Sequence, residues 1–378
     1  QSNFVTAGDV VTLTATFSES VIVDNSSNNP TLTLALDSSN PNATYTSGNN
    51  STVLVFKYTI QTGDTDSNGI SIGSDAIALN SATIRDAADN NATLTHNSVA
   101  NNSSYMVDTT PPTVDSVAIT NGTGMLNNFL NASDAAGSDV VSATVTFSEV
   151  VNSTGTPQLT LAIGSDNQTA TYASGTGSAP LVFQYTIQAG DNDTDGISFG
   201  ANAIDLDNGT ATISDPAGNN ATLDHVPEPS NSSYMVDTEA PRVDNFTIDD
   251  LVLLIGETAT VDLVFSEKVC VVSSACNNVV FSNADITVQT GSLTTMTSSD
   301  DITWTGTFTP TNNREVPTNT LSLTANNYTD LAGNKGPSAT FSSYEVDTIA
   351  PTGTFTLSDR FLRVTDNSTV PLVTDNST

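Results

Sequence analysis

A threefold internal repeat is the feature of this sequence that most constrains its fold. Three elements recur in the same order: a segment ending in Phe-Ser-Glu, an Asp-x-Ala-x-Asn turn, and a linker built on Val-Asp-Thr. The copies lie at 11–21, 141–151 and 260–269 for the segment, at 86–90, 215–219 and 330–334 for the turn, and at 104–112, 233–241 and 343–351 for the linker. Each unit has about 110–130 residues, which is the size of one β-sandwich domain.

Apolar residues alternate with polar or smaller ones inside the repeats, and this period of two predicts half-buried strands. Gly, Asn, Asp and Ser clusters separate the short strands, as in sandwich proteins. In the third repeat we expect 302–308 to be the equivalent strand, with Trp304 a core residue at the position of Phe56 and Phe183. The alternating side chains of the first two repeats are Leu54, Phe56, Tyr58, Ile60, Leu181, Phe183, Tyr185 and Ile187.

The order of these motifs resembles the Ig-like domains of bacterial and archaeal surface proteins, such as giant adhesins and S-layer proteins. The resemblance covers essentially the whole chain and implies an all-β fold of tandem immunoglobulin-like β-sandwich domains in an elongated array. The expected divisions are 1–110, 111–239, 240–349 and a tail at 350–378. A fold of this kind does not by itself determine a ligand or an activity.

The two ends of the array have complementary patterns. Repeats two and three each open with a strand after the linker proline, at 114–119 and 243–248, whereas repeat one lacks such a strand. The tail at 353–364 resembles the opening strand of a further repeat. Two explanations stay open: the chain is a window cut from a longer array, or the tail of one subunit supplies the missing strand of the next.

Composition limits the partners. The chain has 8 Lys and Arg against 41 Asp and Glu, a formal net charge of −33. Nucleic acid and anionic membranes are poor partners for such a chain, because both are bound through Lys and Arg. Cations are the expected counterpart. No apolar run approaches the length of a membrane span, so we expect none in this chain.

Cysteines and sequons point to an exported protein. Cys270 and Cys276 are close enough to close a small loop as a disulfide, or they are two free thiols. Asn-x-Ser/Thr sequons are frequent, which predicts glycans on surface loops. The candidates for glycosylation are Asn25, Asn42, Asn49, Asn91, Asn121, Asn131, Asn152, Asn167, Asn208, Asn231 and Asn367.

An acidic loop occurs at equivalent positions in repeats one and two. Its pattern Asp-x-Asp-x-Asn/Asp-Gly matches the first half of a calcium-binding loop, in which oxygen donors at alternate positions converge on Ca²⁺. The Glu at the twelfth position is missing, and a polar turn is the alternative. The candidate ligands are Asp64, Asp66, Asn68 and Asp75 in repeat one, and Asp191, Asp193, Asp195 and Asn202 in repeat two.

A second candidate cation site lies at the junctions between repeats. Every repeat keeps one acidic residue in each of its three motifs, and linker carboxylates bridge neighbouring domains in calcium-stiffened arrays such as the cadherins. The alternative is that these carboxylates cap turns. The residues are Glu19, Glu149 and Glu267, then Asp86, Asp215 and Asp330, then Asp108, Asp237 and Asp347.

The sequence predicts a structural extracellular protein of the cell surface and not an enzyme, because no catalytic motif is present. The specific hypothesis is a subunit of a filament, sheath or S-layer built by head-to-tail association with copies of itself. The alternative is the stalk of an adhesin whose binding domain lies outside this chain. His96 and His225 are expected to be strand residues and not zinc ligands, since no second His or Cys is near them in sequence.

Overall fold

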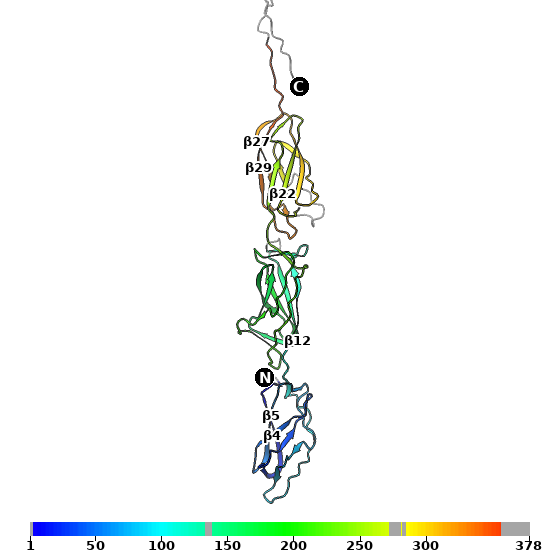
Figure 1. Ribbon diagram of the computed structural model, residues 1–378, viewed down its shortest axis with the longest axis vertical. Helices are drawn as coiled ribbons and strands as arrows, with labels where there is room; N and C mark the ends of the chain where they lie inside the picture. The colour runs from blue at the N-terminus through cyan, green and yellow to red at the C-terminus, as the bar shows by residue number, and fades with distance from the viewer. Residues whose placement is uncertain (1–2, 133–137, 272–280, 282–284, 357–378) are drawn as a thin grey trace, which may run out of the picture. The chain divides into compact units, whose positions relative to one another are not determined.

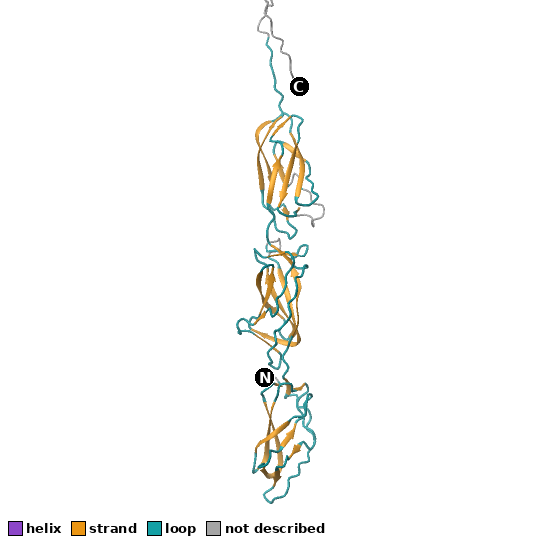
Figure 2. Cartoon of the chain, in the orientation of Figure 1, coloured by secondary structure: helices purple, strands orange, loops and turns teal. Residues whose placement is uncertain are grey.

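The computed structural model describes residues 3–132, 138–271, 281 and 285–356. Within these ranges the chain folds into β-strands without a helix, which confirms the all-β prediction (Figure 2). No helix of the described part could therefore cross a membrane. The chain divides into two compact units, of which the first comprises Gln1–Pro241 with Tyr328–Gly336 and the second Arg242–Asn327 with Pro337–Thr378.

The first repeat supplies two sheets of the first unit. The larger has the order β7-β3-β4-β5-β2-β8, and the smaller has the order β1-β9-β6 with β1 parallel to β9. The strands are β1 (Phe4–Val5), β2 (Val10–Asp24), β3 (Thr31–Thr33), β4 (Asn42–Ser47), β5 (Ser51–Thr59), β6 (Thr65–Asp66), β7 (Ile77–Ala78), β8 (Thr83–Arg85) and β9 (Met106–Asp108).

The second repeat has the same plan with one addition. Its large sheet has the order β10-β12-β15-β14-β13-β17, with β18 also paired to β12, and its small sheet has the order β11-β19-β16. Figure 1 labels β12, which corresponds to β2. The strands are β10 (Val114–Thr123), β11 (Phe129–Leu130), β12 (Val140–Thr154), β13 (Gln158–Ile163), β14 (Asp166–Ser174), β15 (Ser178–Thr186), β16 (Asn192–Asp193), β17 (Ile204–Asp205), β18 (Thr212–Ser214) and β19 (Met235–Asp237).

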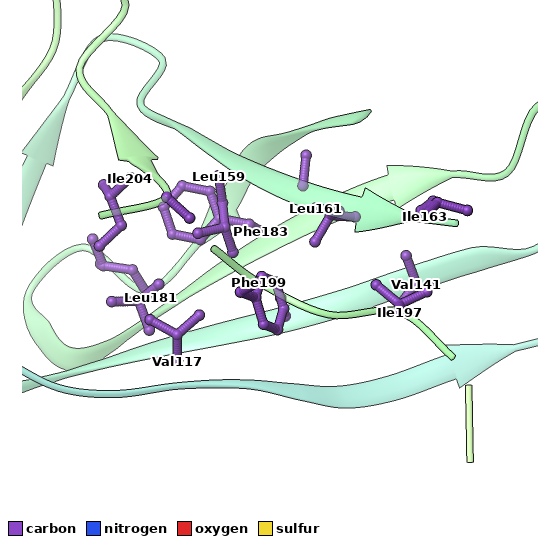
Figure 3. Close-up of a cluster of buried hydrophobic side chains, with 14 of the residues drawn as sticks. Val117, Val141, Leu159, Leu161, Ile163, Leu181, Phe183, Ile197, Phe199 and Ile204 are labelled. Carbon is purple, nitrogen blue, oxygen red and sulfur yellow. The ribbon is translucent and has the colours of Figure 1, made fainter. Parts of the chain in front are cut away.

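Alternation along each long strand builds the core of the second repeat. In β12 the inward residues Val141, Ala143, Val145 and Phe147 are each at most 2% exposed, while polar residues alternate with them. Side chains of β13 and β15 pack against this row, and Figure 3 shows Phe183 among them. Burial of this apolar surface is the main stabilising contribution to such a sandwich.

The strand β10 is the addition that distinguishes the second repeat from the first. It pairs antiparallel with β12 and places Val117, 2% exposed, in the core. In the first repeat β2 pairs with β5 and β8, and no strand of the described residues covers its other edge over residues 10–17. That the first repeat lacks an opening strand stays a prediction.

The second unit contains two four-stranded sheets, β20-β22-β26-β25 and β21-β29-β27-β24. Its strands are β20 (Val243–Ile248), β21 (Val252–Leu254), β22 (Ala259–Phe265), β23 (Cys270–Val271), β24 (Ile286–Val288), β25 (Gly291–Leu293), β26 (Thr303–Pro310), β27 (Glu315–Leu323) and β29 (Ala339–Asp347). The remaining strand, β28 (Tyr328–Thr329), belongs to the first unit.

Trp304 is a core residue, as predicted, but its predicted equivalence to Phe56 and Phe183 is wrong. Trp304 pairs with Leu263, and in the second repeat the residue equivalent to Leu263 pairs with Leu181. Gly306 therefore takes the position of Phe183. A Cβ at Gly306 would lie 2.9 Å from Cγ of Met296, so the methionine side chain occupies the space that the phenylalanine fills in the second repeat.

Candidate metal centre

Three carboxylates from separate parts of the first unit converge at the junction between the first two repeats. Asp108 ends β9, Glu149 lies in β12 and Asp215 follows β18. One oxygen of each lies within 4.8 Å of the others. Asp215 is 2% exposed, and the other two are half-buried. The structure thus brings together three of the carboxylates that the sequence marked as junction candidates.

Backbone contacts hold the linker against the second repeat and so fix Asp108. The amide of Thr222 donates to the carbonyl of Pro112 at 2.8 Å. The amide of Ser148 donates to the carbonyl of Thr113 at 2.9 Å, and the amide of Thr113 donates to Oγ of Ser148 at 3.0 Å. The linker is therefore an integral part of the second repeat.

Asn219 joins two of the carboxylate-bearing residues and was not among the predicted site residues. Its Nδ2 donates to the backbone carbonyl of Asp108 at 3.0 Å and to Oδ2 of Asp215 at 2.7 Å. Oδ1 of Asp215 accepts from the amides of Gly218 and Asn219. The signal in the sequence was the Asn that ends all three Asp-x-Ala-x-Asn turns.

The charges at this junction are uncompensated by protein cations in the described part of the chain. Burial raises the pKa of Glu149, and the neighbouring charges of Asp108 and Asp215 raise it further. The described Arg and Lys residues form no ion pair with these three residues. Three hard oxygen donors without a protein cation form a set that suits a divalent ion such as Ca²⁺.

The same bridging asparagine recurs around the next linker. Nδ2 of Asn334 donates to the carbonyl of Asp237 and to Oδ2 of Asp330, both at 2.9 Å. Asp330 is fully buried, and burial together with the charge of Asp237 raises its pKa to about 6, against the opposing effect of its hydrogen bonds. Burial also raises the pKa of Asp237. The predicted junction residues Glu267 and Asp347 belong to the second unit.

The first repeat contains the corresponding turn. Nδ2 and the amide of Asn90 donate to the two carboxylate oxygens of Asp86, at 2.7 and 2.8 Å. These bonds lower the pKa of Asp86. Glu19 is exposed at the position of Glu149. Glu19, Asp86 and Asn90 line a cavity of about 420 Å³.

The two acidic loops use their aspartates in hydrogen bonds within the fold. In the first, Oδ2 of Asp64 accepts from the hydroxyl of Tyr58 at 2.6 Å, and Oδ1 of Asp66 accepts from the amides of Asn68 and Gly69. The hydrogen bond to Asp64 adds to burial in raising the pKa of Tyr58 to about 12. These contacts favour the polar-turn interpretation for the first loop.

The second loop repeats this pattern. Asp191 accepts from the hydroxyl of Tyr185 at 2.8 Å, and Oδ1 of Asp193 accepts from the amide of Gly196 at 2.8 Å. Oδ2 of Asp195 accepts from Oγ of Ser230, and the oxygens of the three loop aspartates do not converge as a group within 4.8 Å in the described structure. Calcium in these loops stays a prediction.

The last two loop candidates, Asp75 and Asn202, contact the histidines. Each has a positive φ of 55° and accepts a bond from the backbone amide of His96 or His225. Nε2 of His225 accepts from the amide of Ala203 at 2.8 Å, and Nε2 of His96 accepts in the same way from the amide of Ala76. Both histidines therefore serve the fold in the described structure.

Exposure separates the predicted glycosylation sites. Asn131 is 2% exposed and its Nδ2 donates to the carbonyl of Ala332, so its side chain is not accessible to a glycan. Asn231 is half-buried, and Asn367 lies outside the described residues. The exposed candidates are Asn25, Asn42, Asn49, Asn91, Asn121, Asn152, Asn167 and Asn208.

Cys270 is buried and disulfide-bonded. The other cysteine of the sequence, Cys276, lies outside the described residues. A bridge between two residues so close in sequence closes only a short loop, so its entropic stabilisation is at the low end of the usual range.

Comparison with known proteins assigns part of the chain. Residues 237–346 match the family model of the bacterial Ig-like domain. This segment is a bacterial Ig-like domain. The match covers the third repeat, and the other repeats of the Ig-like chain share its three motifs. A domain of this family favours a cell-surface or extracellular location.

No curated protein matches the chain. Among solved structures, the Escherichia coli adhesin FdeC is similar at 10% identity over 90% of this chain and 93% of that chain, with a TM-score of 0.30. The eight N-terminal Ig domains of the Down syndrome cell adhesion molecule are similar at 9% identity, with coverages of 92% and 35% and a TM-score of 0.26. The S-layer protein rSbsC gives 11% identity, coverages of 93% and 55% and a TM-score of 0.22. At such low values we draw nothing from these likenesses.

Proposed function

We propose that this protein is a structural component of an extracellular surface polymer, in which Ig-like domains associate head to tail and cations neutralise the junctions. The observation that carries the proposal is the junction of the first unit. There the linker is held by backbone hydrogen bonds of the next repeat, and the carbonyl of Asp108 accepts a bond from the Asn219 side chain. A joint of this kind fixes each linker to the domain that follows it, which suits a load-bearing array.

Calcium is the proposed ion at this junction. Asp108, Glu149 and Asp215 offer carboxylate oxygens, the ligands that Ca²⁺ prefers, and the backbone carbonyl of Asp108 is already oriented by Asn219. Burial, together with the neighbouring charges of Asp108 and Asp215, raises the pKa of Glu149, so a bound cation would relieve a cost of folding. Isothermal titration of the chelator-treated protein with Ca²⁺ tests this, and an absence of binding heat would remove the ion from the proposal.

The acidic, glycosylated surface is the second part of the proposal. A net charge of −33 repels anions and concentrates small cations near the polymer. Glycans at the exposed sequons would extend this polar layer. Mass spectrometry of the protein from its native source tests the modification, with Asn131 expected to be unmodified because its side chain is buried.

The test of assembly is sedimentation velocity with negative-stain electron microscopy over a range of protein concentrations. End-to-end oligomers that grow with concentration support the polymer. Single particles at every concentration would favour the adhesin stalk, in which the chain acts as a spacer. Running both measurements in Ca²⁺ and in EDTA separates assembly that depends on the ion from assembly that does not.

A further inference from the structure

A turn of the third repeat is built into the first unit. Residues 328–336 are flanked in sequence by the second unit on both sides, yet they pack with the first unit. They contain the Asp-Leu-Ala-Gly-Asn turn at 330–334, and Ala332 at its centre is 1% exposed. The equivalent Ala217 of the second repeat is half-buried, and Ala88 of the first repeat is exposed. The central alanine is common to the three turns, so the difference comes from what lies over it.

A hairpin tip of the second repeat, residues 126–131, lies against this turn. Leu126 and Phe129 exchange backbone hydrogen bonds of 3.0 and 2.8 Å, and the two residues between them, Asn127 and Asn128, have φ values of 53° and 70°. Positive φ at both central positions is typical of a tight type I′ turn, and asparagine tolerates this conformation better than most residues. The local sequence therefore determines the shape of the tip.

Two side-chain amides of the hairpin tip bind main-chain groups of the turn. Nδ2 of Asn127 donates to the carbonyl of Leu331 at 2.8 Å, and Nδ2 of Asn131 donates to the carbonyl of Ala332 at 2.6 Å. Asn131 is itself held in place, because its backbone amide donates to Oδ2 of the buried Asp139 at 2.9 Å. Successive main-chain carbonyls are accepted here, so these bonds recognise the shape of the turn and not its side chains.

Glycine at position 333 allows the turn to approach the tip closely. Its φ is 95°, and a Cβ there would lie 3.3 Å from Nδ2 of Asn131 and 3.4 Å from Cδ2 of Leu126. These distances are at the short end of van der Waals contact, so a longer side chain would have to displace the tip. The displaced Nδ2 of Asn131 is the atom that bonds to Ala332, so this hydrogen bond would be lost as well.

The first repeat has an aspartate at the same position of its turn. Asp89 has a φ of 73°, so its backbone has the left-handed conformation that Gly333 also has. Its carboxylate forms an ion pair with Arg85 of the same repeat, 3.0 Å away. On the hairpin tip of the second repeat this side chain would bring a negative charge against Asn131, which is 2% exposed. The first-repeat turn therefore has the backbone that the tip binds but a side chain that the tip does not accept.

We propose that the hairpin tip of the second repeat is a recognition surface for the Asp-x-Ala-Gly-Asn turn of an Ig-like domain, and that aspartate in place of the glycine excludes a turn from it. The third-repeat turn is then a ligand of the tip, and the first-repeat turn is not. The tip thereby selects which kind of repeat follows the second one and gives the array a fixed order. This selection operates equally in a polymer and in an adhesin stalk, so it does not depend on the proposed function.

Thiol labelling of a buried cysteine measures docking of the turn in the full chain. Ala332→Cys places a thiol in the contact, and Cys270 does not react because it is disulfide-bonded. We expect added Gly333→Asp to raise the rate of maleimide labelling about tenfold or more. Ala217→Cys with Gly218→Asp is the matched control, because Gly218 has a φ of 101° and a Cβ there meets nothing within 4 Å in the described structure. The control rate should change by less than about twofold.

Two substitutions in the hairpin tip test the other side of the contact. Asn127→Gly removes one amide but keeps a residue that adopts positive φ, and Asn131→Ala removes the other amide. Each should raise the labelling rate of Ala332→Cys about tenfold, because a buried carbonyl loses its donor. Asn128→Gly, in the same turn, should leave the rate unchanged.

Hydrogen exchange of residues 328–336 provides a second measurement that needs no added cysteine. The Gly333→Asp protein should exchange faster in this segment than the Gly218→Asp protein, with β15 as the internal check that the fold of the first unit is kept. Unchanged protection in Gly333→Asp would overturn the proposal. An equal loss of protection in both aspartate variants would overturn it too, because the cause would then be strain at positive φ and not exclusion from the tip.

Discussion

Replacement of Glu149 by Gln should stabilise the metal-free protein and weaken its response to calcium. The three junction carboxylates lie within 4.8 Å of one another. At about this separation two charges repel by about 1 kcal/mol in water and by about 3–4 kcal/mol near a protein surface. Because Glu149 is half-buried and partly screened, we expect a gain of about 1–2 kcal/mol in EDTA, or about 2–8 °C in Tm.

The pH dependence of this effect has a definite sign. The raised pKa of Glu149 means that the folded protein binds the proton more tightly than the unfolded chain. In EDTA, stability should therefore rise as the pH falls from neutrality towards 4.5, the ordinary value for Glu. Asp330, with a pKa of about 6, contributes in the same direction. The Glu149→Gln variant should lose only the part of this rise in stability that is due to Glu149.

Differential scanning calorimetry is the suitable assay. The fluorescence of Trp304 would report on unfolding of the second unit and not on the junction in the first unit. Glu19→Gln is the matched control, since Glu19 is exposed and should change stability by less than about 0.5 kcal/mol. In Ca²⁺ the unmodified protein should have a higher Tm than Glu149→Gln, the reverse of the order in EDTA. A lower Tm for Glu149→Gln in EDTA would refute the reasoning, because it would mean that protein contacts stabilise the carboxylate.

Three further predictions concern the fold that supports the junction, and each is measured by calorimetry or chemical unfolding. His225→Ala removes the acceptor of the Ala203 amide, 2.8 Å away, and should cost about 1–3 kcal/mol, with His225→Gln recovering part of the loss. Tyr185→Phe removes the hydroxyl that donates at 2.8 Å to a buried carboxylate and should also cost about 1–3 kcal/mol. Gly196→Ala places a Cβ 2.1 Å from a backbone carbonyl oxygen, so it should cost clearly more than Gly190→Ala, where φ is similarly positive but the space is open. Equal losses for the two glycine variants would contradict the steric reasoning.

The repeat and the period of two were sufficient to predict the strands and the core. The segment around Leu54 and Phe56 is the strand β5 with both side chains fully buried, as the alternation required. The segment 302–308 was likewise predicted to be a strand, and it overlaps β26. The predicted equivalence of Trp304 to Phe56 and Phe183 was nevertheless wrong. Alternation fixes which face a residue occupies but not its register along the strand, and a shift of two residues preserves the face.

The candidate site was predicted unequally. Position in the repeat was enough to identify Asp108, Glu149 and Asp215 as candidates, because each of the three motifs keeps a carboxylate in every repeat. The part played by Asn219 depends on a contact over 111 residues of chain, to which no local pattern refers. Conversely, the acidic loops matched a ligand pattern, but Tyr58 and the loop amides use the same oxygens.

The parallel pairing of β1 with β9 determines how a pulled domain would resist. Phe4 and Val5, at the start of the first repeat, lie beside Met106 and Val107 at its end. Tension applied through the chain draws these two parallel strands in opposite directions along their length. Their hydrogen bonds are then loaded in shear and break together, instead of opening one after another as in a peeled hairpin. The same pairing of β21 with β29 gives the bacterial Ig-like domain this mechanical clamp as well.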